Sequence, residues 1–469
     1  LPLALAGLGH EAALILPFYR QARKAGVPVV RTGEKLRIPI ASRQVEGEIL
    51  RSHLPGSEVP VYLIDQPDYY DRDELYRRGG EDYKDNCERF VFFSRAVLET
   101  IRLLQLEIDC IHANDWQTGL VPAYLQIEYR QRDGFEHLGT VFTVHNLGYH
   151  GQFWHWDMLL TGLDWKYFNW QQMEFFGHLN LLKTGLVFAD ILSTVSPRYA
   201  QEIQTPQFGH GLEGVLTARR KDLYGIINGI DYEVWNPATD GYLAANYHED
   251  TVSVGKPKCK AELQERCKLP MRAGVPVIGM ITRLADQKGL DLVAQAAPEW
   301  IKEDLQLVVL GTGEPKYHQL LGELAAQHPE KVSLHLTFDD ALAHQIEAGA
   351  DMFLMPSRYE PCGLNQLYSL KYGTVPVVRA VGGLADTIVD ATPAGLAAGE
   401  ANGFSFSEYT SEALLRTLRR ALAAYRQREM WRRLMQTGMQ QDWSWRRSAR
   451  EYAALYERAL AEHAEPVCV

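Results

Sequence analysis

The residues best suited to chemistry in the second half of the chain are two basic side chains that follow an apolar run. Arg283 and Lys288 come directly after residues 276–281 and are five positions apart. On a loop between a strand and a helix, the planar guanidinium and the compact ammonium could both contact one diphosphate. A solvated pair on the surface is an equally good interpretation of this segment alone.

Other residues of the second half could belong to the same site. They are a carboxylate and two pairs of residues that would each begin a helix. Glu360 follows the apolar run DMFLM, and Gly363-Leu364 would begin a helix shortly after it. Gly382-Gly383, in VGGLAD, offers a second helix start. Because the N-terminal amides of helices bind anions, these starts and the basic pair together predict a diphosphate pocket in a chain without a Walker A motif.

The side chains between those glycines have different expected roles. Glu360 would repel phosphate, so we expect its carboxylate to accept hydroxyl groups of a sugar. Cys362 could be interpreted as a nucleophile, but the residues around it suit phosphate binding rather than acyl transfer. We therefore expect a packed thiol whose backbone amide lies beside the phosphate.

In the first half of the chain, polar residues follow two further apolar runs. Asp115 lies in HANDW, and His145-Asn146 follows the run GTVFTV. A single histidine at the end of a strand is more often structural. The equivalent placement of these residues beside an aromatic residue favours a site for sugar hydroxyls.

The elements that would position these residues are short apolar strands, each followed by a turn and an amphipathic stretch. Alternation of this kind predicts parallel sheets covered by helices on both faces. We therefore predict an α/β fold with two Rossmann-like domains that face each other across a cleft. Ligands of such sheets bind beyond the carboxyl ends of the strands.

Three segments follow from the distribution of turn residues and helical patterns. We predict one Rossmann-like domain over residues 1–232 and a second over 233–442. Residues 443–469 are predicted to form a helix that packs back on the first domain.

Composition excludes several classes of protein. The chain has 469 residues and a formal net charge of −11, which disfavours non-specific binding of nucleic acid or anionic membranes. Six cysteines without a CxxC pair predict neither a disulfide scaffold nor a zinc module, and favour a reducing compartment. No apolar stretch has the length of about 20 residues that spans a bilayer. The apolar start lacks a basic leader, so we expect no signal peptide.

Seven segments of the chain, in the same order, resemble the bacterial glycogen synthases and plant starch synthases. They are HANDW, TVHNLGYHG, HGLEG, INGIDYEVWNPATD, ITRLADQKG, PSRYEPCGLNQLYSLKYG and GGLAD. The resemblance covers nearly the whole chain. It implies the GT-B type of glycosyltransferase fold and the transfer of glucose, with retention, from ADP-glucose to the non-reducing 4-hydroxyl of an α-1,4-glucan. No metal and no cofactor are expected. The implied location is the bacterial cytoplasm, or the plastid stroma in a photosynthetic eukaryote.

The same resemblance implies a role for individual residues. Arg283 and Lys288 would hold the donor diphosphate, Glu360 the glucosyl hydroxyls, and His145 the glucosyl 6-hydroxyl. Further donor-binding residues implied by it are Cys362, Gly363, Leu364, Phe338, Gly382, Gly383 and Asn228, with Phe338 stacking on adenine. Further residues implied on the acceptor and sugar side are Asp115, Asn146 and Tyr83.

The chain departs from two patterns. Family members begin with a strand and a Lys-x-Gly-Gly-Leu loop whose lysine contacts the donor, whereas Leu1 matches the helix after that loop. We expect the missing part to belong to a longer native chain. Many retaining transferases of this architecture carry a second glutamate eight residues after the first. Tyr368 stands there, as starch and glycogen synthases tend to have.

The mechanism of retention, the nucleotide of the donor and the function each have alternative interpretations. No second carboxylate is placed for double displacement, so we favour substitution on one face, with the leaving phosphate taking the acceptor proton. The choice of ADP over UDP rests on stacking and shape, and the sequence does not fix it. The alternative functions are a catalytically impaired glucan- or nucleotide-binding homologue and, less favoured, an α-glucan phosphorylase, for which we find no pyridoxal-phosphate motif.

Overall fold

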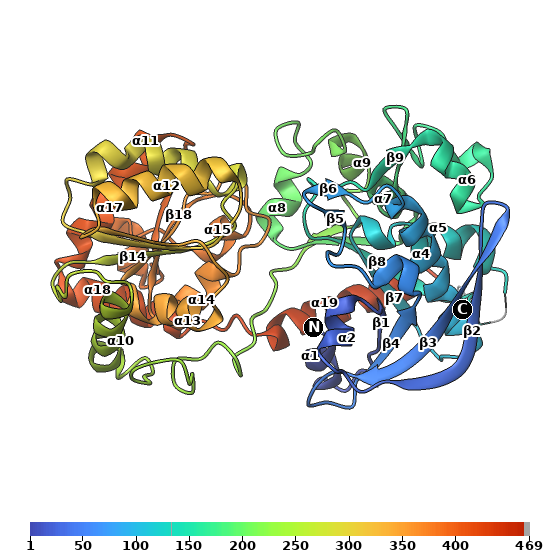
Figure 1. Cartoon of the computed structure of the whole chain (residues 1–469), viewed down its shortest axis with the longest axis horizontal. Helices are drawn as coiled ribbons and strands as arrows, with labels where there is room; N and C mark the ends of the chain where they lie inside the picture. Colours follow the sequence, from blue (N-terminus) through green and yellow to red (C-terminus); the bar gives the residue numbers. More distant parts are fainter. Residues whose placement is uncertain (133, 464–469) are drawn as a thin grey trace. The chain divides into compact units, whose positions relative to one another are not determined.

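The structure is a computed structural model that describes residues 1–132 and 134–463. The chain divides into two compact units (Figure 1). Unit 1 comprises Leu1–Val195, Ala200–Ile226 and the C-terminal segment from Arg446, and unit 2 comprises Ser196–Tyr199 and Ile227–Trp445.

Unit 2 is built on a six-stranded parallel sheet in the order β16-β15-β14-β17-β18-β19. Its strands are β14 (Val277–Ile281), β15 (Gln306–Leu310), β16 (Val332–His335), β17 (Met352–Met355), β18 (Val375–Arg379) and β19 (Phe404–Phe406). The order places β14 beside β17, although 70 residues of sequence separate them.

Helices cover both faces of this sheet (Figure 1). They are α10 (Val252–Arg266), α11 (Leu290–Trp300), α12 (Pro315–Gln327), α13 (Asp340–Gly349), α14 (Asn365–Lys371), α15 (Gly382–Thr387), α16 (Pro393–Ala398), α17 (Ser411–Tyr425) and α18 (Arg428–Met439), with a 3₁₀ turn η5 (Asp286–Lys288). Successive strand residues point to opposite faces, so Ile278 and Met280 pack in one hydrophobic cluster and Val277 in the other.

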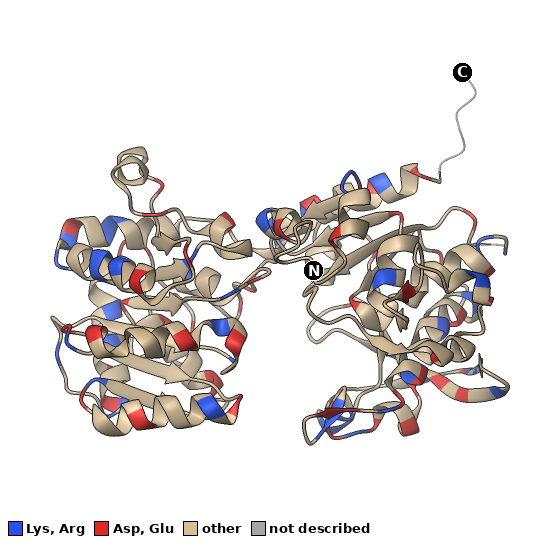
Figure 2. Ribbon diagram, turned by 90° about the horizontal axis from the view of Figure 1, so that it is seen from above, with Lys and Arg blue, Asp and Glu red and all other residues tan. Residues whose placement is uncertain are grey.

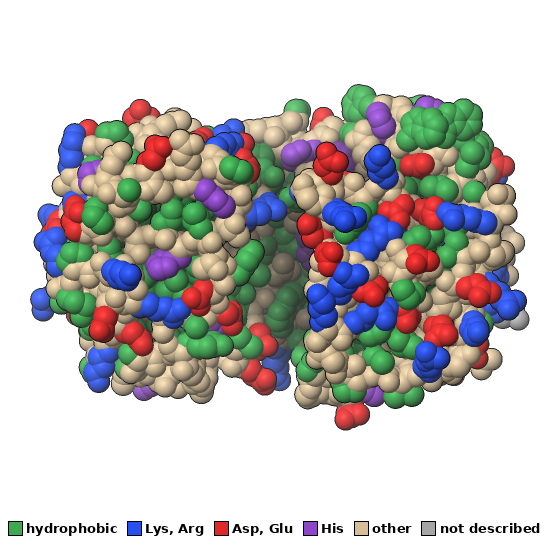
Figure 3. Space-filling model, in the orientation of Figure 1, with side chains coloured by type: hydrophobic (Ala, Val, Ile, Leu, Met, Phe, Trp, Pro, Cys, Tyr) green, Lys and Arg blue, Asp and Glu red, His purple; other side chains and the backbone are tan. Residues whose placement is uncertain are grey.

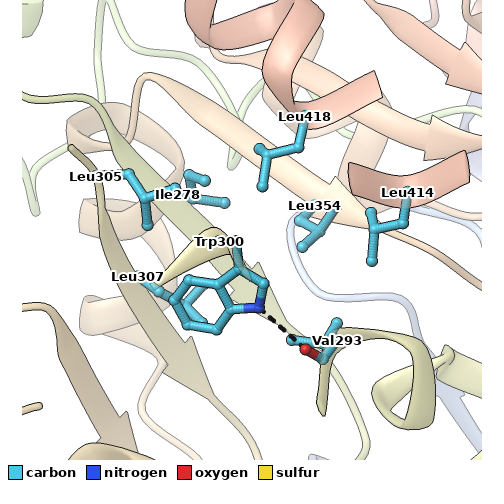
Figure 4. Close-up of a pocket in the computed structure, with 8 residues that line it drawn as sticks. All are labelled: Ile278, Val293, Trp300, Leu305, Leu307, Leu354, Leu414 and Leu418. Carbon is cyan, nitrogen blue, oxygen red and sulfur yellow. Dashed lines mark hydrogen bonds between the residues drawn. The ribbon is translucent and has the colours of Figure 1, made fainter. Parts of the chain in front are cut away.

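One small apolar gap lies inside this core, between the sheet and helices α11 and α17 (Figure 4). The indole N–H of Trp300 donates to the Val293 carbonyl at 3.0 Å. The residues that line the gap are Ile278, Val293, Trp300, Leu305, Leu307, Leu354, Leu414 and Leu418. All eight belong to the buried hydrophobic core, so the gap is a packing feature and no ligand site.

Unit 1 contains a four-stranded parallel sheet in the order β13-β12-β8-β7. Its strands are β7 (Cys110–Asn114), β8 (Gly139–Val144), β12 (Ile191–Thr194) and β13 (Leu223–Gly225). The helices of this part are α4 (Asn86–Leu103), α5 (Leu120–Tyr124), α6 (Met158–Thr161), α7 (Leu181–Phe188), α9 (Glu213–Ala218) and nearly all of α19 (Trp445–Ala461). Helix α8 (Pro197–Glu202) is divided between the two units, with its first half in unit 2. Shorter turns are η1 (Trp116–Thr118), the π-helical η2 (Leu125–Tyr129), η3 (His155–Asp157) and η4 (Trp165–Tyr167).

The N-terminal part of unit 1 forms a second, mixed sheet in the order β1-β4-β3-β2. It combines a parallel pair, β1 (Leu14–Pro17) and β4 (Pro60–Asp65), with the long antiparallel hairpin β2 (Val30–Ile40) and β3 (Arg43–His53). The remaining elements are α1 (Pro2–Ala6), α2 (Arg20–Lys24), α3 (Pro67–Tyr70), the pair β5 (Arg77–Arg78) and β6 (Glu81–Asp82), and a small antiparallel sheet of β9 (Gln152–Trp154), β10 (Glu174–Phe175) and β11 (His178–Asn180). The sequence analysis did not predict the hairpin.

Charged side chains of both signs are interspersed over the helices of each unit (Figure 2). Among the described helices, none is both long and apolar enough to cross a membrane. Within the same residues, no group of three or more His, Cys, Asp or Glu side chains is arranged to hold a metal ion.

Candidate active site

The loops that follow β14 and β17 bring two predicted site residues into contact. The Lys288 ammonium lies 3.0 Å from Oε1 and 2.7 Å from Oε2 of Glu360. The Glu360 side chain is 7% exposed and that of Lys288 is 22% exposed. A nearly buried carboxylate requires a partner, and the ammonium provides it. The contact explains how a carboxylate can stand beside groups expected to bind phosphate.

Ser357, at the start of the same loop, is a residue that the sequence analysis missed. Its buried hydroxyl donates to Oε2 of Glu360 at 2.9 Å, so both carboxylate oxygens have partners. A serine at the carboxyl end of a strand, three residues before a glutamate, is the signal that could have identified it. A small cavity beside it is lined by residues of β14, β17, their loops and the start of α14, including Lys288, Ser357 and Asn365.

The two loops are interlocked by their backbones. Gly289 has φ +70°, and a Cβ on it would lie 2.0 Å from the carbonyl oxygen of Pro356. The backbone N–H of Arg358 donates to the Gln287 carbonyl at 2.8 Å. Any side chain at position 289 would therefore separate the loops that carry Lys288 and Glu360.

The glycines at the start of α15 have a packing role that the sequence alone did not indicate. A Cβ on Gly382 would lie 2.0 Å from the carbonyl oxygen of Glu360, and one on Gly383 would lie 1.9 Å from that of Cys362. The backbone N–H of Gly383 donates to the Glu360 carbonyl at 3.1 Å. These glycines allow the α15 backbone to support the Glu360 loop.

The predicted helix starts are present, but both helices are short. α14 has 7 residues and α15 has 6. The macrodipole of such a short helix is smaller than that of a long helix and does not by itself indicate an anion site. Gly363 precedes α14 with φ +71°, and Leu364 is 38% exposed. Individual backbone N–H groups, rather than a helix dipole, are therefore the candidate hydrogen-bond donors to a phosphate.

Cys362 is buried, and this burial raises the pKa of its thiol to about 12. The thiol is therefore protonated at neutral pH, which agrees with a packing role. A backbone hydrogen bond from Asn228 reaches Cys362, so these two predicted residues lie together. Tyr368, at the position of the second glutamate of other transferases, stacks on Trp235 with ring centroids 4.0 Å apart.

Arg283 and Phe338 are the more exposed members of the predicted donor set. Arg283 lies on the β14 loop, where Nη2 is 3.4 Å from Oε1 of Gln287. Phe338 is 90% exposed directly before α13, and Asp339 next to it caps that helix by accepting from the Leu342 N–H at 2.8 Å. Its free ring suits stacking with a planar base.

In unit 1, the neighbouring strands β7 and β8 bring Asp115 and His145 together. Asp115 Oδ1 accepts from the backbone N–H of His145 at 2.8 Å, and the Asn146 backbone N–H also bonds this carboxylate. Burial raises the pKa of Asp115. Nε2 of His145 lies 3.0 Å from Oδ1 of Asn114. Asp115 thus holds the histidine loop through its backbone.

The other residues predicted in unit 1 have local partners. Asn146 Oδ1 accepts from the Gly148 N–H at 3.0 Å. Tyr83 follows β6, and its hydroxyl donates to the Glu74 carbonyl at 3.2 Å. The Arg72 guanidinium lies 4.7 Å from the centre of the Tyr83 ring.

The chain matches two family models. Residues 1–218 match the starch synthase catalytic domain, and residues 263–436 match glycosyl transferases group 1. Together with the two Rossmann-like units, these matches define the class: the chain is a glycosyltransferase of the GT-B type, as the sequence predicted. The predicted α/β fold class is confirmed.

Similar proteins identify the family within that class. The chain is 48% identical over 464 residues to a glycogen synthase of Anaeromyxobacter dehalogenans, covering 98% of this chain and 94% of that protein. It is 45% identical to a glycogen synthase of Syntrophotalea carbinolica, with 99% and 94% covered. Its structure resembles the catalytic domain of starch synthase IV from Arabidopsis thaliana bound to ADP and acarbose, with a TM-score of 0.88, 32% identity, and 98% and 94% covered. The chain belongs to the glycogen and starch synthase family and is a glucosyltransferase of glucan synthesis.

Proposed function

We propose that this glucosyltransferase transfers glucose from ADP-glucose to the non-reducing 4-hydroxyl of an α-1,4-glucan, with retention of the anomeric configuration. The observation that carries the proposal is the contact of Lys288 with Glu360 at the ends of β14 and β17. A similar starch synthase domain was solved with ADP and acarbose, which supports the nucleotide and the type of acceptor.

The donor half of the reaction uses residues of unit 2. Arg283 and Lys288 would hold the diphosphate, assisted by backbone N–H groups of Cys362, Gly363 and Leu364. When the bond between the glucosyl C1 and the phosphate oxygen breaks, negative charge develops on the diphosphate, and fixed cations stabilise it. The Lys288 ammonium would then be shared between the leaving phosphate and Glu360.

Glu360 would bind the glucosyl hydroxyls. Its two oxygens are held by Lys288 and Ser357, so the carboxylate is fixed before the donor arrives. Preorganised polar groups of this kind need little rearrangement during the reaction. In unit 1, His145 would bind the glucosyl 6-hydroxyl, and Asp115 would fix the loop that carries it.

We propose substitution on one face of the glucosyl ring. The acceptor O4 forms a bond to C1 on the face from which the phosphate departs, and the proton of the 4-hydroxyl passes to the leaving phosphate oxygen. The products are ADP and a glucan one residue longer. The packing of Tyr368 on Trp235 supports this scheme, because the position of a second carboxylate is occupied by a stacked ring.

The remaining predicted residues complete the proposal. Phe338 would stack on the adenine, while Asn228 and the glycines Gly382 and Gly383 would shape the donor side. Tyr83 and Asn146 would lie on the sugar and acceptor side. Neither a metal nor a cofactor takes part in the proposed scheme. Because the glycogen synthases with 45% and 48% identity to the chain come from bacteria, we place the reaction in the cytoplasm.

Release of ADP from ADP-glucose in the presence of glycogen tests the proposal directly, on a chain that carries its native N-terminus. UDP-glucose is the matched donor, and we expect it to be used less efficiently. The anomeric configuration of the new linkage, observed by NMR, tests retention. Absence of ADP release would contradict the proposed activity, and a pyridoxal absorbance band with phosphate-dependent release of glucose 1-phosphate would indicate a phosphorylase.

A further inference from the structure

The loop between β17 and α14 carries Glu360 and the N–H groups that the proposed function assigns to the diphosphate. Every carbonyl group of residues 357–363 in this loop accepts a hydrogen bond from the protein. The donors are the guanidinium of Arg379 for Ser357 and Arg358, the amide of Gln287 for Tyr359, the backbone N–H of Gly383 for Glu360 and Pro361, and the amide of Gln366 for Cys362 and Gly363. The sequence analysis assigned no role to Arg379 or Gln366.

Gln366, the second residue of α14, is fully buried beside the end of this loop. Its Nε2 lies 3.0 Å from the carbonyl oxygens of Cys362 and Gly363, and 3.4 Å from Oγ1 of Thr387. Because carbonyl oxygens only accept, Nε2 must be the donor, and this determines the orientation of the amide. A Cβ on Gly363 would lie 2.4 Å from Oε1 of Gln366, so only glycine lets the side chain pack against the loop.

Holding a carbonyl group also fixes the N–H group that follows it. In a trans peptide, the C=O of one residue and the N–H of the next point in opposite directions. Since the carbonyls of Cys362 and Gly363 point to Gln366, the N–H groups of Gly363 and Leu364 point away from it. Neither N–H donates to a backbone carbonyl within the part of the chain that the structure describes. Gln366 therefore orients two of the N–H groups assigned to the diphosphate.

The other amide atom of Gln366 argues against a role in packing alone. Its Oε1 is buried and has no hydrogen-bond partner among the described residues. An unsatisfied buried acceptor costs free energy, and leucine or methionine would fill a similar space without that cost. The presence of a glutamine is explained by its donor, which contacts both carbonyl groups of the loop.

Arg379, the last residue of β18, holds the beginning of the same loop. On the face of unit 2 shown in Figure 3, basic and acidic side chains are interspersed at the surface, whereas Arg379 is only 8% exposed. Its Nη1 lies 2.7 Å from the carbonyl oxygen of Arg358 and 3.4 Å from that of Ser357. Its Nε donates to the Ser407 carbonyl at 3.0 Å. The guanidinium therefore joins the loop after β17 to the residues after β19.

Arg379 acts on Glu360 through Ser357. The Ser357 hydroxyl donates to Oε2 of Glu360 at 2.9 Å, so the position of the carboxylate depends on the main chain that Arg379 holds. A guanidinium has five donors in one plane and can bond carbonyl groups of two segments at once, which the point charge of an ammonium cannot do in the same geometry.

We propose that Gln366 and Arg379 are positioning residues for glucosyl transfer and that each has its own target. Gln366 orients the N–H groups that bind the diphosphate, and Arg379 fixes the end of the loop on which Ser357 holds Glu360. This inference rests on the proposed function, because both targets are parts of the donor site proposed there. Separate targets predict separate effects, on the binding of ADP and on kcat respectively.

The first test measures the Kd for ADP by calorimetry, on the chain with its native N-terminus. Gln366→Met fills the space of the amide without its donor, and we expect the Kd to rise about tenfold, which corresponds to about 1.4 kcal/mol. Gln366→Leu is the second variant, with the same expectation. The matched control is Gln264→Met. Gln264 is a buried glutamine of unit 2 whose Nε2 donates to Oε1 of Gln306, at the amino end of β15, at 2.7 Å. The control should lower the melting temperature and leave the Kd unchanged.

Arg379→Met should have the converse pattern. We expect kcat for ADP release to fall about 100-fold, as for a misplaced catalytic group, with little change in the Kd for ADP. Arg379→Lys keeps the charge but not the planar fork, so its kcat should lie between those of the wild type and Arg379→Met, and it serves if the loss of the buried cation prevents folding. The matched control is Lys331→Met, whose ammonium holds the carbonyls of Ile301 and Glu303, each at 2.7 Å. It should retain normal kcat.

The outcomes separate this inference from the proposed function. Unchanged ADP affinity in both Gln366 variants would overturn the role of Gln366, as would an equal loss in Gln264→Met. A loss of kcat in the Arg379 variants no larger than in Lys331→Met would overturn the role of Arg379. A wild type that binds no ADP would contradict the proposed function as well, whereas a wild type that binds ADP no better than the Gln366 variants contradicts only the positioning role.

Discussion

The two units place polar residues at the ends of neighbouring parallel strands, but they hold their carboxylates in different ways. In unit 2, Glu360 is held by side chains, through the Lys288 ammonium and the Ser357 hydroxyl. In unit 1, Asp115 is held by backbone N–H groups that follow β8. The first carboxylate depends on a cation from another loop, whereas the second fixes the loop that it contacts.

This difference indicates different roles. A carboxylate paired with a side-chain ammonium can share that cation with a phosphate, as the proposed reaction requires. A carboxylate bonded to backbone N–H groups cannot leave without disturbing the loop. Asp115 also has φ +55°, a strained backbone for a residue other than glycine, so its own position is determined by these contacts. Glu360 is therefore expected to act on substrate, and Asp115 to position His145.

The largest effect is expected from Glu360→Ala. Removing the carboxylate should lower kcat for ADP release by about 1,000-fold, the upper range for loss of one preorganised polar group. The Kd for ADP, measured by calorimetry, should change little, because Lys288 keeps its charge. Glu314→Ala on the loop after β15 is the control and should retain normal kcat. A large loss of ADP affinity in Glu360→Ala would contradict the assignment to the sugar.

Lys288→Ala should separate the two functions of the ammonium. We expect weaker binding of ADP and a kcat about 100-fold lower, since the diphosphate loses a cation. The variant should also be less stable than Lys288→Ala/Glu360→Ala, because the single change leaves a nearly buried carboxylate without its cation. Urea unfolding of the single and double variants measures this. A double variant less stable than the single one would show that the ion pair is unimportant to the fold.

Asp115→Asn tests whether unit 1 uses its carboxylate for positioning. An amide oxygen can accept one of the backbone hydrogen bonds but carries no charge, so we expect kcat to fall by about 10-fold to 100-fold and the melting temperature of the enzyme to fall as well. His145→Gln should lower kcat without lowering the melting temperature. If Asp115→Asn changes activity but not stability, its carboxylate acts on substrate, and the contrast between the units is wrong.

The smallest effect concerns His112, a structural histidine in the middle of β7. Its ring nitrogens contact Thr143 Oγ1 at 2.6 Å and the Tyr456 hydroxyl at 2.9 Å, and burial lowers its pKa to about 3. Below pH 6.5 the unfolded chain takes up a proton that the folded chain accepts only near pH 3. Stability should therefore fall as the pH falls through this window, by at most about 1.4 kcal/mol per pH unit for this group.

The measurement is the urea unfolding free energy of unit 1 at pH 7 and pH 5, for the wild type and His112→Gln. The variant should lose less stability between the two values. His53, an exposed histidine of the same unit, provides the control substitution His53→Gln. Identical losses in the wild type and His112→Gln would exclude this residue as the source of acid sensitivity.

Much of the fold could be predicted because parallel strands have a clear signature. Runs such as those around Val277 and Met352 are buried on both sides and therefore continuously apolar. The hairpin of β2 and β3 was missed, since exposed polar residues such as Arg31, Lys35 and Arg37 obscure its alternating pattern. The buried residues of β2, Leu36, Ile38 and Ile40, do alternate with exposed ones, but they lie only in the second half of that strand.

The roles of the glycines could not be predicted from local sequence. In the sequence, Gly382 and Gly383 indicated a helix start near phosphate. In the structure, glycine is required at both positions because a Cβ would collide with the carbonyl groups of Glu360 and Cys362. This contact joins segments about 20 residues apart, and no local pattern specifies it. The phosphate-binding role assigned to them stays a prediction.

The sequence by itself determined the family, the fold class and the loops on which Arg283, Lys288 and Glu360 lie, because motif residues and strand periodicity are local properties. Only the tertiary structure decided which residues meet. The strand order sets β14 beside β17, which joins Lys288 to Glu360 across 72 positions of sequence. It also left the tryptophans of residues 149–180 on the surface instead of in a core, a distinction that apolar composition cannot make. The exposure of a side chain and the identity of its partners depend on how the whole chain packs, so only the tertiary structure determines them.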